Sequence, residues 1–170
     1  LTTKEKVGNL SNSIPLPETK DQEIVVPAGI REKLKGQSGI VKGSIITKPD
    51  TSDRNNPLLF VSEVTPFHVH VKQGYFNTLV WVTDLSTGNP VPGAKVKIYW
   101  DSYSSLRANP DGITSSVTDL SGLAVLGGKN IIPEQSMRRS GGYQTYFDQM
   151  KLFMRVEKGD DIALLTLDYD

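Results

Sequence analysis

The sequence predicts an all-β fold, an antiparallel β-sandwich of about seven strands over residues 57–170. The strongest observation is the strict alternation of apolar and polar residues from Ala94 to Trp100, which is typical of a half-buried antiparallel strand. Further short runs follow at close intervals and are punctuated by Gly, Pro, Asn and Asp. No apolar pattern of helical period extends beyond a single turn. A barrel of short strands would fit the same pattern, and we favour the sandwich.

Residues 1–56 differ from the rest of the chain and are predicted to form a separate N-terminal segment. Residues 1–23 are polar, their few apolar residues have no period, and we expect them to be extended. Short runs with the composition of a strand or of one helical turn lie at residues 24–26, 30–34 and 40–46. Residues 48–57 are dense in turn formers and almost free of apolar side chains. We therefore place a domain boundary between residues 56 and 57.

The strands predicted after this boundary are short. They lie at residues 58–64, 67–71, 79–82, 94–100, 113–118, 123–126, 152–156 and 162–167. The glycines Gly88, Gly93 and Gly122 lie in the turns between them and are predicted to adopt positive φ angles, which a side chain would disfavour. Trp81 stands in the middle of an apolar strand, and we expect its bulk to fill the space between the two sheets.

The composition excludes several classes of function. Lys and Arg together number 19, as do Asp and Glu, so no net charge attracts nucleic acid or an anionic membrane. The chain has no cysteine, which excludes disulfides, thiolate nucleophiles and cysteine-ligated zinc. No apolar run approaches the roughly 20 residues of a membrane-spanning helix. The chain begins without Met, and we expect it to be part of a larger protein.

Residues with metal-binding or acid–base chemistry form no recognisable site in the sequence. His68 and His70 are two residues apart, so on a strand they share one face and could chelate a metal, but no third His and no Cys completes a site. We expect both to lie on the solvent face of their strand. Asp160-Asp161, Asp111 and Asp119 lie beside turn residues, where carboxylates commonly accept backbone amides.

The sequence also contains no recognisable motif for hydrolysis or phosphate binding. There is no Gly-x-Ser-x-Gly motif, and Gly127-Gly128 and Gly141-Gly142 do not connect a strand to a helix as a phosphate-binding loop does. Arg138-Arg139 could be a protease cleavage site or an anion contact, but such a pair is more often a solvated loop. The candidates for an aromatic sugar-binding platform are Tyr99, Tyr103, Tyr143 and Tyr146. We therefore predict that the chain is not an enzyme and has no catalytic, cofactor-binding or metal-binding residue.

Four phrases of the sequence together resemble a macroglobulin domain of the bacterial alpha-2-macroglobulins. They are Thr83-Asp84-Leu85 after a hydrophobic strand, the turn from Gly88 to Ala94, the turn from Thr118 to Ala124, and the closing hairpin from Lys158 to Leu165. The resemblance covers about residues 57–170 and implies a seven-stranded antiparallel immunoglobulin-like (macroglobulin-type) β-sandwich. Before it would come an extended, partly strand-forming N-terminal segment, residues 1–56, which is the tail of a preceding domain or a linker. Single phrases also occur in adhesin repeats and in transthyretin-like or carboxypeptidase-regulatory modules.

The resemblance also implies a function. The chain would be a structural scaffold module of a broad-spectrum endopeptidase inhibitor, which traps proteases after they cleave its bait segment. The alternative is an Ig-like binding module of a bacterial adhesin, or a transthyretin-like regulatory domain. Members of the family are periplasmic, and most are lipoproteins anchored to the inner membrane. The partners would be neighbouring macroglobulin domains, with endopeptidases as targets of the whole protein, no nucleic acid, and a membrane only through a lipid anchor outside this chain. Since the chain has no Cys, the family's thioester cannot lie in it, and no functional residue is carried over.

Overall fold

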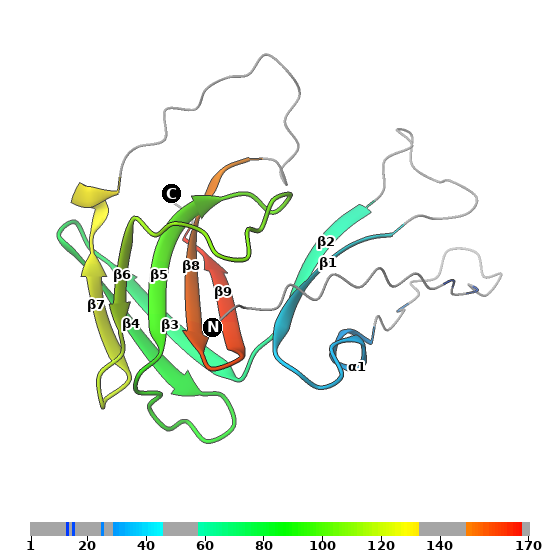
Figure 1. Ribbon diagram of the computed structural model, residues 1–170, viewed down its shortest axis with the longest axis horizontal. Helices are drawn as coiled ribbons and strands as arrows, with labels where there is room; N and C mark the ends of the chain where they lie inside the picture. Colours follow the sequence, from blue (N-terminus) through cyan, green and yellow to red (C-terminus); the bar gives the residue numbers. More distant parts are fainter. Residues whose placement is uncertain are drawn as a thin grey trace, which may run out of the picture.

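The computed structural model describes residues 13, 15, 25, 29–45, 58–132 and 149–167, and this part of the chain is almost entirely β-structure (Figure 1). In chain order its elements are the helix α1 (Ile30–Lys33), the strands β1 (Gly39–Ile45), β2 (Leu58–Val64), β3 (Phe67–Gln73), β4 (Asn77–Asp84), β5 (Lys95–Asp101), β6 (Thr114–Val117) and β7 (Leu123–Gly127), the 3-10 turn η1 (Lys129–Ile131), and the strands β8 (Lys151–Lys158) and β9 (Asp161–Thr166). The single helical turn expected after Gly29 is confirmed as α1.

Seven strands form a sandwich of two antiparallel sheets. One sheet has three strands in the order β3-β4-β7, and the other has four in the order β6-β5-β8-β9. The predicted seven-stranded sandwich is therefore confirmed. The strand predicted at residues 58–64 exists as β2, but it pairs with β1 in a separate two-stranded sheet and not with the sandwich.

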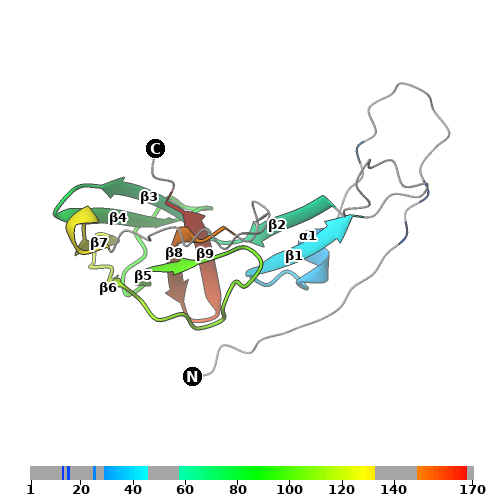
Figure 2. The same ribbon diagram turned by 90° about the horizontal axis from the view of Figure 1, so that it is seen from above.

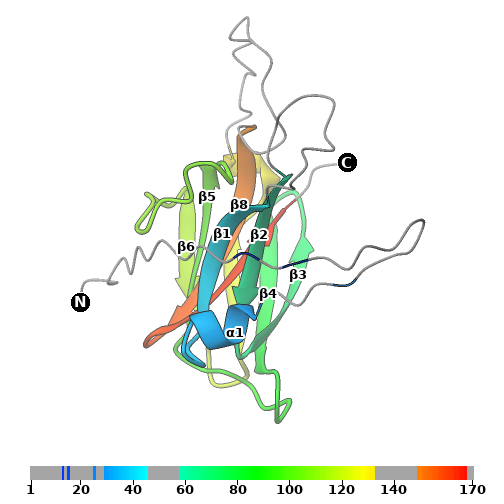
Figure 3. The ribbon, with the colours of Figure 1, turned by 90° about the vertical axis from the view of Figure 1, so that its right-hand side faces the viewer.

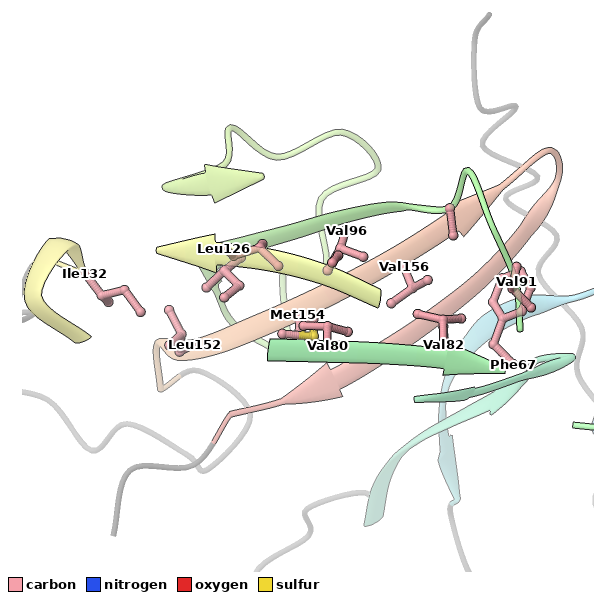
Figure 4. Packing of buried hydrophobic residues seen from close by; sticks show 14 residues of the cluster. Phe67, Val80, Val82, Val91, Val96, Leu126, Ile132, Leu152, Met154 and Val156 are labelled. Carbon is pink, nitrogen blue, oxygen red and sulfur yellow. The ribbon is translucent and has the colours of Figure 1, made fainter. Parts of the chain in front are cut away.

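The core lies between the two sheets, where side chains from both inner faces meet (Figure 4). Its members are Phe67, Val80, Val82, Val91, Ala94, Val96, Ile98, Ala124, Leu126, Ile132, Leu152, Met154, Val156 and Ala163. The alternation that begins at Ala94 is confirmed, because Ala94, Val96 and Ile98 are completely buried there.

The prediction that Trp81 fills the core is wrong. Val80 and Val82 occupy the inner face of β4 and are fully buried. Since successive side chains of a strand point to opposite faces, Trp81 lies on the outer face, where 43% of its surface is exposed. The core therefore contains valine at the level where we expected tryptophan.

The strands β1 and β2 form a hairpin that stands beside the sandwich. They pair in register over seven residues, from Gly39 opposite Val64 to Ile45 opposite Leu58. Figure 2 shows the hairpin extending away from the sandwich with α1 beside it. In Figure 3 the hairpin faces the viewer. This pairing joins residues on either side of the boundary placed between residues 56 and 57, so the domain division stays a prediction. Of the strand candidate at residues 24–26, only Val25 is described, and the linker at residues 48–57 lies outside the described residues.

Candidate interaction surface

The residues that carry the family resemblance gather at one end of the sandwich and close its turns. The Asp84 carboxylate accepts hydrogen bonds from the hydroxyl (2.6 Å) and backbone amide (3.0 Å) of Ser86. It also accepts the amide (2.8 Å) and hydroxyl (2.9 Å) of Thr87. These bonds, that from the Ser86 hydroxyl foremost, lower the pKa of Asp84 to about 2. Asp84 is thus committed to the turn that follows β4.

The two turns that pass from one sheet to the other meet at this end. The β4–β5 turn and the β6–β7 turn are joined by the Thr118 hydroxyl, which accepts the amide of Ala94 (2.8 Å) and donates to the carbonyl of Val91 (2.6 Å). The carbonyl oxygen of Gly122 accepts a hydrogen bond from the backbone amide of Val82 (2.9 Å). Its φ is 74°, and the positive φ angles predicted for Gly88, Gly93 and Gly122 are all confirmed. We call this meeting point the turn junction.

The outer face of the four-stranded sheet is covered by other parts of the chain. Tyr99 lies on this face, stacks on Phe153 and is only 1% exposed, so it is not available as a sugar-binding platform. Burial raises the pKa of Tyr99 to about 12. The loop after β5 folds back over the face, where the Tyr103 and Phe153 rings pack in a T-shaped arrangement with centroids 5.2 Å apart. Arg155 is buried on the same face and pairs with Glu157 (2.6 Å).

Asp101 holds the loop after β5 in place. Its side chain, only 2% exposed, accepts the amides of Ser102 (2.8 Å) and Arg107 (2.9 Å) and the Ser105 hydroxyl, and lies 3.5 Å from the Arg107 guanidinium. Burial alone would raise the pKa of Asp101, but these hydrogen bonds and the guanidinium outweigh it and bring the pKa below its ordinary value. The ionised Asp101 side chain therefore has a structural role, because its hydrogen bonds hold the loop after β5 in place.

The β1–β2 hairpin completes this cover at the edge strand β9. The amide of Ile162 donates to the Ser38 hydroxyl (2.9 Å), and the amide of Leu164 donates to the Glu63 carboxylate (2.9 Å). Two side chains thus satisfy edge amides that would otherwise invite another strand. Between hairpin and sheet lies a groove of about 360 Å³, lined by Ile40, Val61, Ser62, Glu63, Tyr103, Phe153, Leu164 and Thr166. Burial raises the pKa of Glu63.

The outer face of the three-stranded sheet carries an apolar patch that remains exposed. Strand register places Trp81 between His70 on β3 and Leu123 on β7, and Leu79 between Lys72 and Val125. The Trp81 indole stacks on the His70 ring, with centroids 5.6 Å apart, and its Nε1 donates to the Ser121 carbonyl (3.1 Å). We call the exposed side chains of Leu79, Trp81, Leu123 and Val125 the Trp81 face. A contiguous apolar patch of this kind is typical of a surface that meets a partner.

No model of a known protein family matches the sequence, and no curated protein matches it. Among solved structures, the fold is similar to native alpha-2-macroglobulin from Escherichia coli. A fragment spanning domains MG0, NIE and MG1 matches 86% of this chain with a TM-score of 0.57 and 14% identity. A fragment spanning NIE and MG1 matches 91% with a TM-score of 0.52 and 15% identity. The chain has a macroglobulin-type fold.

The macroglobulin-type chain is shorter than the fragments that it matches, since it spans 39% of the first and 60% of the second. The match covers 86% of this chain for the first fragment and 91% for the second, whereas residues 57–170 make up only two thirds of the chain. The likeness therefore extends beyond the sandwich into the N-terminal segment.

Of the site residues predicted from the sequence, the structure of this macroglobulin-type fold brings only His68 and His70 together among the described residues, on one face of β3. His68 and His70 are exposed on the outer face of β3, as predicted. Asp119 accepts the amides of Ser121 (2.8 Å) and Leu123 (2.9 Å), which confirms its turn role. Asp111 and Asp160 lie outside regular strands, and Asp161 opens β9.

Gly127 ends β7, and Gly128 lies against the backbone of Tyr75, where a Cβ would stand 2.4 Å from the Tyr75 carbonyl oxygen. This packing accounts for glycine at position 128 without any phosphate. The remaining candidates, Arg138, Arg139, Gly141, Gly142, Tyr143 and Tyr146, lie outside the described residues.

Among the described residues, no group of three or more His, Cys, Asp or Glu is placed to hold a metal ion, and no helix is long and apolar enough to cross a membrane. That the chain has no catalytic, cofactor-binding or metal-binding residue stays a prediction. The sequence did not predict the Trp81 face, because Trp81 itself was expected in the core. The signal that could have identified it is the apolar run at residues 79–82, which is apolar on both faces of the strand.

Proposed function

We propose that the chain is a structural scaffold module of a larger alpha-2-macroglobulin-type protein, a broad-spectrum endopeptidase inhibitor that traps proteases after bait cleavage. The observation that supports this most is the structural likeness to the Escherichia coli fragments over 86–91% of the chain. In this proposal the chain is not an enzyme and binds no nucleic acid. The parent protein is periplasmic and reaches the inner membrane through a lipid anchor outside this chain.

The contribution of the module is to hold its neighbours in place through the Trp81 face. The opposite face is already occupied by the β1–β2 hairpin and the loop after β5, through contacts such as Ile162 to Ser38 and Tyr103 to Phe153. Covering the four half-exposed side chains of the Trp81 face would contribute on the order of 1 kcal/mol each, since full burial of a large apolar side chain is worth about 1.5–3 kcal/mol. That is enough for an interface within one polypeptide, where no translational entropy is lost.

The test of the inhibitor function uses the parent protein and an endopeptidase. We expect the parent to protect a large protein substrate from digestion, while a short peptide substrate is still cleaved because it reaches the trapped enzyme. The isolated chain is the control and is expected to protect neither substrate, because a scaffold module carries no trap of its own. Digestion of the large substrate at the same rate with and without the parent protein would contradict the proposal, as would protection by the isolated chain.

A further inference from the structure

We propose that His68 and His70 chelate one divalent transition-metal ion, of the kind represented by Cu²⁺ and Ni²⁺, on the exposed face of β3. The two side chains leave the strand on the same face, and their ring centroids lie 4.3 Å apart. The sequence could show only that the residues share a face, and with no third His or Cys it predicted no site. The ring separation is a new observation, and it bears directly on chelation.

The separation fits two metal–nitrogen bonds at a right angle. A metal–imidazole bond is about 2.0–2.1 Å long and lies in the ring plane. Two such bonds about 90° apart place the ring centroids on the order of 4.5 Å from each other, and a tetrahedral angle widens this to about 5.2 Å. The observed separation of 4.3 Å, with 58° between the ring planes, lies nearer to the right-angle value, which square-planar and octahedral ions use. Imidazole nitrogens suit Cu²⁺ and Ni²⁺, and Cu²⁺ leads the affinity order of the divalent ions, so these are the two ions that we propose.

The pair is held in position before any ion arrives. β3 pairs with β4 along its whole length, from Phe67 opposite Asp84 to Gln73 opposite Thr78, so the strand that carries the ligands is anchored. The His70 ring stacks on Trp81 with an angle of 24° between the planes. The Trp81 indole is itself fixed by its bond to the Ser121 carbonyl. Preorganised ligands lose less conformational entropy on binding.

Among the described residues, the surroundings add no further protein ligand to the pair. Across the strand pair, His68 faces Thr83 and His70 faces Trp81, and no three-residue ligand group exists among the described residues. Lys72 follows on the same face and repels a cation. The ion would therefore keep open positions for water or for a donor from a partner, and the site is weaker than a closed four-ligand zinc site.

Trp81 supplies the readout, because a paramagnetic ion bound to a stacked imidazole quenches the indole fluorescence. Titration of the chain with CuCl₂ is expected to give saturable quenching with one ion per chain, reversed by a chelator. His68→Ala and His70→Ala should each weaken binding by about tenfold or more. Lys72→Ala, a change on the same strand and face, should bind Cu²⁺ at least as tightly as the unmodified chain. All three positions are exposed, and a thermal unfolding curve of each variant checks that it is folded.

A second measurement separates this site from binding elsewhere on the chain. Trp81→Phe should lose the Cu²⁺-dependent quenching, although Trp100 still fluoresces, and should keep the heat of Cu²⁺ binding measured by calorimetry. Nitrogen hyperfine structure from two imidazoles is expected in the electron paramagnetic resonance spectrum and should be absent from the doubly substituted variant. Equal Cu²⁺ affinity in the unmodified chain and in His68→Ala would overturn the site, and tighter binding of Zn²⁺ than of Ni²⁺ would overturn the right-angle geometry.

Discussion

The two outer faces of the sandwich belong to one fold and yet differ in what covers them. On the four-stranded sheet, Tyr99 and Phe153 are almost completely buried, because the loop after β5 and the β1–β2 hairpin close over them. On the three-stranded sheet, Trp81 remains 43% exposed beside three other apolar side chains. The covered face draws its cover from its own chain. In the scaffold role that we propose, the Trp81 face is the surface that would meet a neighbouring domain.

The difference also separates stability from function. Residues of the covered face form contacts that exist whenever the chain is folded, so changing them should change the free energy of unfolding. Residues of the Trp81 face make few such contacts, so changing them should leave folding intact and alter association. Matched substitutions on the two faces therefore measure whether the comparison holds.

The largest effect is expected for Phe153→Ala on the covered face. Its ring is completely buried and contacts both Tyr99 and Tyr103, so its removal leaves a cavity and should cost about 3–5 kcal/mol. Trp81→Ala removes a larger ring from the other face and is expected to cost about 1 kcal/mol or less, because the indole is half exposed. Urea unfolding of both variants gives the two values. A greater loss for Trp81→Ala than for Phe153→Ala would mean that the faces are assigned the wrong way round.

The second effect tests the turn junction, which fixes the distance between the two faces. Gly122 and Gly93 have the same φ of 74°, so alanine carries the same backbone strain of about 1–2 kcal/mol at either position. At Gly122 a Cβ would also lie 2.4 Å from the Val82 carbonyl oxygen, whereas at Gly93 it meets no atom within 4 Å. Gly122→Ala should therefore lower the thermal midpoint distinctly more than Gly93→Ala. Equal thermal midpoints for the two variants would show that the turn junction accommodates the Cβ at position 122 without loss of stability.

The turn junction was readable in the sequence because its chemistry is local. Asp84 accepts hydrogen bonds from the residues two and three positions later, and Asp119 accepts them from residues up to four positions later. The pattern of Asp, Ser, Thr and Gly in the sequence therefore already predicts the turns. The positive φ angles at Gly88, Gly93 and Gly122 follow from the same local rules. Local hydrogen bonding is encoded in neighbouring residues, and a single sequence displays it.

Which face of each strand is buried could not be predicted from the sequence, because burial depends on residues that are distant in the chain. Residues 79–82 are apolar on both sides of the strand, so the period of two separates the faces without saying which is inside. Trp81 was assigned to the wrong side for that reason. The side of β5 opposite Ala94, Val96 and Ile98 carries Tyr99 and Asp101, and the loop that folds back over this side accounts for their burial. The partner of β2 lies across residues 46–57, which no local pattern spans.

A smaller effect is expected at the loop that covers Tyr99. Asp101→Asn removes the charge that several donors share and should cost about 1.5–3 kcal/mol. The pKa of Asp101 is lower in the folded chain than in the unfolded chain, so the unfolded state binds more protons as the pH falls. Its contribution is thus fully present above the unfolded pKa of about 3.9 and is lost as the pH falls through the folded value. Unfolding from pH 7 to pH 3 should show a steeper loss in the unmodified chain than in Asp101→Asn; parallel curves would remove Asp101 as the anchor.

The smallest effect is expected at Glu63, where the sign is reversed. Burial raises its pKa, so the folded state binds more protons, and the stability that it contributes is present below the unfolded pKa of about 4.3 and is lost as the pH rises through the folded value. Glu63→Gln keeps an oxygen that accepts the Leu164 amide and removes the charge that burial disfavours. At pH 7 the variant should therefore be as stable as the unmodified chain or slightly more stable, and the Leu164 amide should exchange with solvent no faster. Ser38→Ala is the matched control at the next edge amide, since it deletes the acceptor and should speed exchange at Ile162 alone. Faster exchange at Leu164 in Glu63→Gln would mean that the ionised carboxylate itself holds the hairpin, and the covered face would then depend on charge more than on packing.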